Sequence, residues 1–146
     1  MYTIVLWHTQ QTIEALQKNK LAIDSELFIY SDAPKNENAL EKVQVVRNYI
    51  KTIKGFRKVT IIKREKNWWL SDSIIDGVTK IVNQYGKIIV LEDDIVTSLY
   101  FLKFMNDALE FYKNEEKVWH INGWNYPIEI ENFSDTFLWR VMNCWS

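Results

Sequence analysis

Three consecutive carboxylates, Glu92-Asp93-Asp94, are the side chains of this sequence best suited to metal chemistry. They follow the apolar run 88–91, whose composition is that of a strand buried on both faces of a parallel sheet. Acids at the carboxyl end of such a strand lie where α/β sheets bind ligands. Adjacent carboxylates repel one another unless a cation neutralises them, and oxygen ligands suit Mg²⁺ or Mn²⁺. The alternative that the three acids leave open is a solvated turn that caps the next helix.

Two other apolar runs also end in polar residues. Asp32 lies in a Ser-Asp-Ala-Pro turn after the run 27–30, and the run 59–62 leads into a basic and aromatic loop. Because the carboxyl ends of parallel strands share one edge, we expect Asp32, the loop 63–67 and the three acids to converge on one crevice. Three cations of this loop could assist a diphosphate, although a solvated basic loop is the plainer interpretation: Lys63, Arg64 and Lys66.

Strands and helices that could position these groups alternate along the chain. We predict strands over residues 3–7, 27–30, 59–62, 88–91, 118–121 and 137–142. Apolar residues at helical spacing predict helices over about 9–20, 38–53, 71–85 and 97–113, with Gly55 and Gly86 ending the second and third. This alternation indicates an α/β fold: a three-layer, Rossmann-like, mostly parallel sheet with helices on both faces.

Length and composition describe an ordinary globular protein. The 146 residues suffice for one domain, residues 1–146, with a sizeable core, and 47% of them are hydrophobic. A net charge of −1 gives no indication of nucleic-acid binding. The single cysteine excludes a disulfide framework. We find neither a signal peptide nor an apolar run of about 20 residues that could span a membrane, so we expect a cytoplasmic protein.

Several familiar nucleotide-binding classes lack their motifs here. The sequence has only four glycines and contains neither GxxxxGK[ST] nor GxGxxG, which argues against P-loop and dinucleotide-binding proteins. A phosphorelay receiver domain carries its acidic pair after the first strand, whereas the acids here follow the fourth predicted strand. With two histidines, Ser-His-Asp catalysis has little support.

The segments IIVLEDDIVTSLYFLKFMNDALEFY, HINGWNYP and ELFIYSDAPKNE resemble nucleotide-sugar-dependent glycosyltransferases of the GT-A fold. The chain is similar to the N-acetylglucosaminyltransferase I group and related bacterial sugar transferases, over nearly its whole length. In that family the Glu-Asp-Asp sequence is the variant DXD motif. The resemblance implies the nucleotide-binding half of a GT-A fold that transfers a hexose or N-acetylhexosamine from a nucleotide sugar, most often a UDP-sugar, to a glycan or other hydroxyl acceptor.

The resemblance also implies roles for individual residues. Asp94 matches the acid that ligates the divalent metal, Mn²⁺ or Mg²⁺, on the donor diphosphate, and Asp93 matches the acid near the ribose and the metal-bound water. Glu92 matches the residue near the donor sugar. Asp32 matches the acid that recognises the nucleotide base, and Asn67 matches the asparagine of an Asn-Leu-Gly-like loop beside the donor.

The sequence departs from the family pattern in three places. The loop reads Asn67-Trp68-Trp69, so the glycine is replaced, and the Asn-Arg-Pro-like turn after the first strand is missing. The general base is not identifiable. Between the Tyr126-Pro127 turn and the last residue, Asp135 is the only acid that could substitute for it. We therefore expect an N-terminal portion truncated at the acceptor side, with little transfer activity alone. The alternative is a non-catalytic nucleotide-binding, metal-binding or interaction module with a degenerate GT-A fold.

Overall fold

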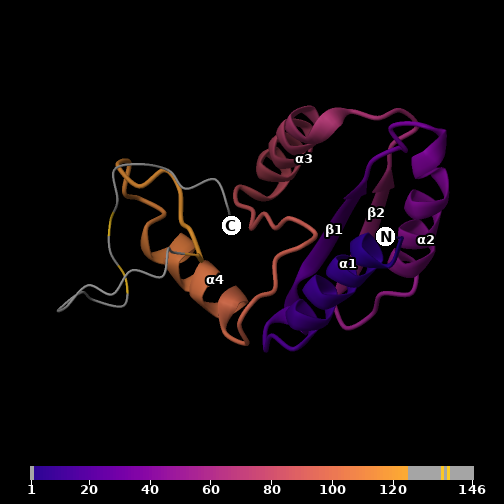
Figure 1. Ribbon diagram of the computed structural model, residues 1–146. Helices are drawn as coiled ribbons and strands as arrows, with labels where there is room; N and C mark the ends of the chain where they lie inside the picture. Colours follow the sequence, from indigo (N-terminus) through magenta and orange to yellow (C-terminus); the bar gives the residue numbers. More distant parts are fainter. Residues whose placement is uncertain (1, 125–135, 137, 139–146) are drawn as a thin grey trace.

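The computed structural model describes residues 2–124, 136 and 138, and their side chains from residue 6 onward. This part of the chain is a mixed α/β structure of four α-helices and a two-stranded parallel sheet (Figure 1). The elements are α1 (Tyr2–Gln17), η1 (Ala22–Asp24), β1 (Glu26–Ser31), η2 (Glu37–Ala39), α2 (Leu40–Ile50), β2 (Lys58–Lys63), α3 (Trp69–Tyr85) and α4 (Phe101–Phe111). Among the described helices, none combines the length and apolar character that a membrane crossing requires.

The first hydrophobic cluster lies between the sheet and helices α1 and α2. Strand β1 pairs with β2 in parallel, from Glu26 opposite Lys58 to Ser31 opposite Lys63. Side chains alternate across a strand, so every second residue faces this cluster. The cluster contains buried Ile13, Ile50 and Ile53, with Leu27, Ile29, Val46, Tyr49, Phe56, Val59 and Ile61 packed against them.

Helix α3 contacts the side chains that β1 presents in the other direction. A Cβ atom at Gly77 would lie 3.2 Å from the ring of Tyr30, so the absence of a side chain lets α3 approach the strand closely. The rings of Phe28 and Tyr85 meet edge to face, with centroids 5.7 Å apart. The Tyr85 hydroxyl donates to Glu26 at 2.9 Å, and this bond is the main cause that lowers the pKa of the Glu26 carboxyl.

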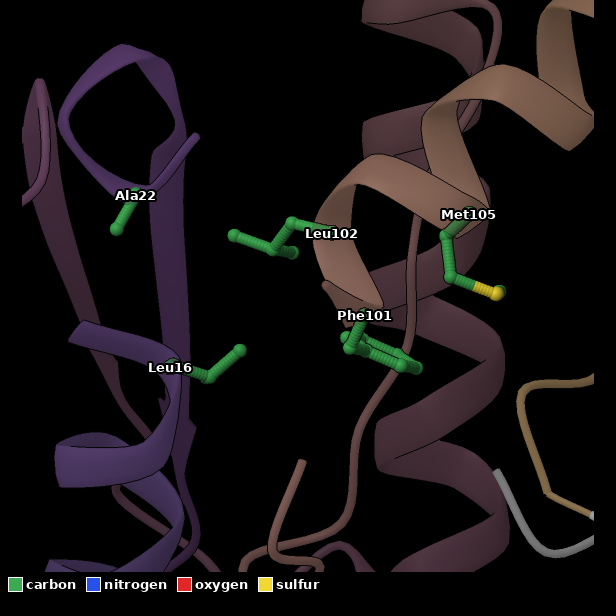
Figure 2. Packing of buried hydrophobic residues seen from close by; sticks show 5 residues of the cluster. All are labelled: Leu16, Ala22, Phe101, Leu102 and Met105. Carbon is green, nitrogen blue, oxygen red and sulfur yellow. The ribbon is translucent and has the colours of Figure 1, made fainter. Parts of the chain in front are cut away.

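A second hydrophobic cluster joins α4 to the end of α1. Figure 2 shows Leu16 and Ala22 facing Leu102 and Phe101, with Met105 one turn further along α4. Ile89 and Leu91 from the segment between α3 and α4 pack against the same cluster, as does Phe56 from the connection before β2. Phe56 therefore contacts both clusters.

The predicted strands 27–30 and 59–62 are confirmed and form β1 and β2. Helices are present in the predicted regions 38–53, 71–85 and 97–113, and Gly86 ends α3 in the left-handed conformation at φ +77°. Gly55 also has a positive φ of +90°, but α2 already ends at Ile50. The prediction that Gly55 ends this helix is therefore wrong.

The predicted strand 3–7 is wrong, because α1 begins at Tyr2 and continues through the predicted helix start to Gln17. A short continuous apolar run is compatible with a strand or with a helix, since it has no periodicity of its own. Here the run is continuous with residues that are helical, so it becomes the first turns of one longer helix.

The predicted strands 88–91 and 118–121 are also wrong, because both segments are irregular. A strand exists only when another strand supplies hydrogen-bond partners along its edge. In the described residues, β1 and β2 pair with each other, and residues 88–91 instead pack two side chains against α1 and α4. The strand predicted over 137–142 lies, except for residue 138, outside the described residues.

Candidate functional site

Arg47 of α2 ties together the carboxyl ends of β1 and β2. Its Nη2 donates to the backbone oxygens of Ser31, Asp32 and Arg64 at 3.2, 3.1 and 2.9 Å, and its Nε donates to the Ser31 hydroxyl at 3.1 Å. Three carbonyls from two strand ends therefore share one guanidinium. This arrangement fixes the relative positions of the two loops that leave the sheet at this edge.

Asp32 and Asn67, predicted from sequence to lie near one another, are brought together at this edge. The Asp32 carboxylate accepts the backbone N–H of Ala33 at 2.9 Å and that of Trp68 at 3.0 Å from each oxygen. Asn67 donates to the Ala33 carbonyl at 2.8 Å and accepts the backbone N–H of Trp69 at 3.3 Å. Both side chains thus hold the loop after β2 against the turn after β1.

Arg64 is buried. The sequence favoured a solvated basic loop at this place, and for Arg64 this interpretation is wrong. Its guanidinium carbon lies 4.0 Å from the ring centre of Trp68 and 5.3 Å from that of Tyr30. It forms an ion pair with Asp76 of α3, which also pairs with Lys80 at 2.8 Å. Hydrogen bonds from Lys80 and then from Arg64 lower the pKa of the Asp76 carboxyl. This group fastens the sheet edge to α3.

Trp69, which the sequence offered as an aromatic that could stack on a sugar or a base or pack in the core, has a backbone conformation that sequence reasoning did not predict. Its φ is +60°, and it is the only residue other than glycine with a positive φ in the described chain. A bulky residue in this conformation is an outlier, because its Cβ crowds the backbone. The indole is 59% exposed, and the Lys35 ammonium lies 4.6 Å from its ring centre. The sequence contained a sign of this conformation, because Trp69 stands where the family pattern that the sequence resembles has a glycine.

The three acids form a turn that lies beside α1. The Thr12 hydroxyl donates to the backbone oxygen of Asp93 at 3.0 Å. Glu92 and Asp94 line a hollow of about 150 Å³ together with Ile95 and Trp124, whereas Asp93 does not line it. The hydrogen bonds that hold Asp32 and Asn67 together involve none of these acids, so the predicted single crevice is seen only in part.

The acids of the turn suit a metal ion that arrives with a phosphate ligand. Within the residues that the structure describes, no group of three or more His, Cys, Asp or Glu side chains is placed to hold a metal ion. Mg²⁺ is commonly bound by one or two carboxylates together with substrate phosphates. Glu92 and Asp94 at one hollow meet that smaller requirement. A resident metal held by protein ligands alone does not fit the described residues.

Comparison of the chain with known protein families, with curated proteins and with solved structures found no match. The weak candidate for a general base, Asp135, lies outside the described residues.

Proposed function

We propose that this chain is the nucleotide-sugar-binding part of a GT-A glycosyltransferase, which binds a UDP-sugar with a divalent metal for transfer to an acceptor hydroxyl. The observation that carries the proposal is the conformation of Trp69. Its φ of +60° is one that glycine adopts readily and tryptophan does not. The backbone at this position therefore has the shape expected of the family's glycine, although the residue is different. Asn67 and Asp32 supply the bonds that hold it.

The proposal extends to the fold. Helices contact the β1–β2 sheet from both sides, with Ile13 and Ile50 on one side and Gly77 on the other. This arrangement supports a three-layer, Rossmann-like sheet, the nucleotide-binding half of a GT-A fold. In such a fold the ligand binds at the carboxyl ends of the strands, where Asp32 lies.

The acidic turn supplies the second part of the proposed site. Asp94 would hold Mn²⁺ or Mg²⁺, and Glu92 would lie on the donor-sugar side of the same hollow. A bound divalent ion would neutralise the donor diphosphate and make it a better leaving group. The Thr12 hydroxyl, by holding the Asp93 carbonyl, positions the turn against α1.

Calorimetric titration with UDP-sugars, with and without Mn²⁺, tests this function. We expect wild type to bind a UDP-sugar more tightly with Mn²⁺, and Asp94→Ala to lose the Mn²⁺-dependent gain while keeping its circular dichroism spectrum, because Asp94 is exposed. The matched control is Asp24→Ala, an exposed aspartate of η1, which should bind as wild type does. Absence of binding by folded wild type, or an unchanged Mn²⁺ gain in Asp94→Ala, would contradict the proposal.

A non-catalytic module with a degenerate GT-A fold is the second candidate. It is favoured by the use of Asp32 and Asn67, whose side chains bind the protein backbone. The two candidates differ in turnover. The module would bind a UDP-sugar without hydrolysing it, whereas the donor-binding part of a glycosyltransferase should retain slow donor hydrolysis, so release of UDP above the rate without protein distinguishes them.

A further inference from the structure

We propose that Trp69, together with Lys35, forms a stacking site for the nucleobase of the donor. This inference rests on the proposed function and assigns the base-binding surface within it. It begins from a conflict at Trp69: the residue adopts a backbone conformation unfavourable for its side chain, yet the side chain remains 59% exposed. Burial therefore offsets little of the strain, and an exposed cation–π contact with Lys35 is too weak to account for an indole here.

The loop holds the backbone that carries the Trp69 indole in a defined position. The Trp68 N–H is bound by both oxygens of Asp32, and the Trp69 N–H is bound by Asn67. The Trp68 ring lies against the buried Arg64 guanidinium, at 4.0 Å from its centre. The residues before and at Trp69 are therefore fixed to the sheet edge, so the exposed ring is presented without a large loss of loop entropy on binding.

The surroundings of the ring indicate the class of ligand. An exposed indole face stacks on planar rings, and base–aromatic stacking tolerates any base. The Lys35 ammonium lies over the ring, 4.6 Å from its centre, so a positive charge covers one face of the indole and a base would stack on the opposite face. A ligand that combines a planar ring with negative charge matches both features, and a nucleotide is such a ligand. A neutral sugar would use the ring alone and leave the cation without a counterpart.

Two small probes separate the parts of this ligand. UMP carries a base and a phosphate, and ribose 5-phosphate carries only the phosphate and the sugar. Binding of each is measured by calorimetry to wild type, Trp69→Gly, Trp69→Phe and Trp69→Leu. We expect Trp69→Gly and Trp69→Leu to weaken UMP binding about tenfold, as lost stacking does, and Trp69→Phe to weaken it far less. Ribose 5-phosphate should bind all four proteins equally.

Lys35→Gln separates the charge from the ring. It should weaken UMP and ribose 5-phosphate alike, because the ammonium acts on the phosphate that both carry. The matched aromatic control is Trp119→Ala, since Trp119 is 93% exposed and lies in the irregular segment after α4. This variant should bind both probes as wild type does.

Thermal unfolding provides the second readout. Relief of the positive φ should leave Trp69→Gly at least as stable as wild type. A less stable Trp69→Gly with unchanged UMP binding would overturn the inference and make Trp69 a packing residue. Should the glycine variant fail to fold, the Phe and Leu pair still decides, because equal UMP affinities of these two variants would exclude stacking. If wild type binds a UDP-sugar and no Trp69 variant changes that binding, this inference alone is wrong. If wild type binds no nucleotide, the proposed function is wrong as well.

Discussion

Asn19 is a single buried side chain that links three segments. It lies just after α1, is 4% exposed, and donates from Nδ2 to the carbonyls of Ala15 at 3.0 Å and Ser98 at 3.1 Å. Its Oδ1 accepts the backbone N–H of Leu102 at 2.9 Å, which is one of the first N–H groups of α4. Such N–H groups have no partner within their own helix, so Asn19 acts as the cap that α4 lacks locally.

Replacing Asn19 by alanine should lower the free energy of unfolding by about 2–3 kcal/mol, because the buried Leu102 N–H loses its partner and the bonds to the Ala15 and Ser98 carbonyls are lost. Urea denaturation followed by circular dichroism measures the change. Asn48→Ala is the matched control: Asn48 is exposed on α2, where it accepts a bond from Gln44, and the expected change is within about 0.5 kcal/mol. Equal losses in the two variants would contradict the role of Asn19.

At the scale of elements, the contact between α3 and the sheet depends on charge as well as packing. Arg64 at the end of β2 pairs with Asp76 of α3, and its side chain is 8% exposed. Removing one partner of such a pair leaves a buried charge uncompensated, so the pair matters more than a surface ion pair. The Tyr30 ring of β1 lies beside Gly77 of α3 and under the Arg64 guanidinium.

Asp76 should make this contact sensitive to acid. Bonds from Lys80 and Arg64 lower the pKa of Asp76 below its ordinary 3.8, so its carboxylate stabilises the folded state above that pH. This contribution is lost as the pH falls through the folded-state pKa. The difference in unfolding free energy between wild type and Asp76→Asn should therefore be large at pH 6 and shrink at a pH well below 3.8.

Urea denaturation at the two pH values measures this difference. Lys80→Met serves as the companion variant, because losing the bond that lowers the Asp76 pKa most should bring this pKa back toward its ordinary value and weaken the acid sensitivity. If the difference between wild type and Asp76→Asn is the same at both pH values, ionisation of Asp76 does not stabilise the contact between α3 and the sheet.

At the scale of the whole molecule, two hydrophobic clusters meet at Phe56. One lies between the sheet, α1 and α2, and the other joins α1 to α4. Gln17 of α1 also donates to the carbonyl of Lys54, two residues before Phe56, at 2.6 Å. The connection between α2 and β2 is thus the place where the two clusters are held to one another.

Phe56→Ala should lower the free energy of unfolding by about 2–3 kcal/mol, because it opens a cavity next to both clusters. The expected loss is not larger, since Phe56 is only half-buried. Guanidinium denaturation followed by tryptophan fluorescence and by circular dichroism measures this change. Phe111→Ala removes the same side chain at a site that is 80% exposed, with an expected change within about 0.5 kcal/mol. Similar effects of the two substitutions would show that Phe56 does not join the clusters.

Some of this structure follows from local sequence alone. The runs 27–30 and 59–62 are rich in branched and aromatic residues and are bounded by turn residues, which is why β1 and β2 were predictable. Helix α3 was predictable from its apolar spacing, and its end from Gly86, whose φ of +77° suits glycine. The neighbourhood of Asp32 and Asn67 also followed, because parallel strands bring their carboxyl ends to one edge.

Other features were decided only by tertiary contacts. An apolar run such as 88–91 has the composition of a strand, but a strand also needs a partner edge, and these residues found α1 and α4 instead. Residues 3–7 had the same ambiguity and became helical. The burial of Arg64 depended on Tyr30 of β1, Asp76 of α3 and Trp68 of the loop before α3. Local propensity acts within a few residues, whereas pairing and burial depend on residues distant in sequence, and so only the folded chain determines them.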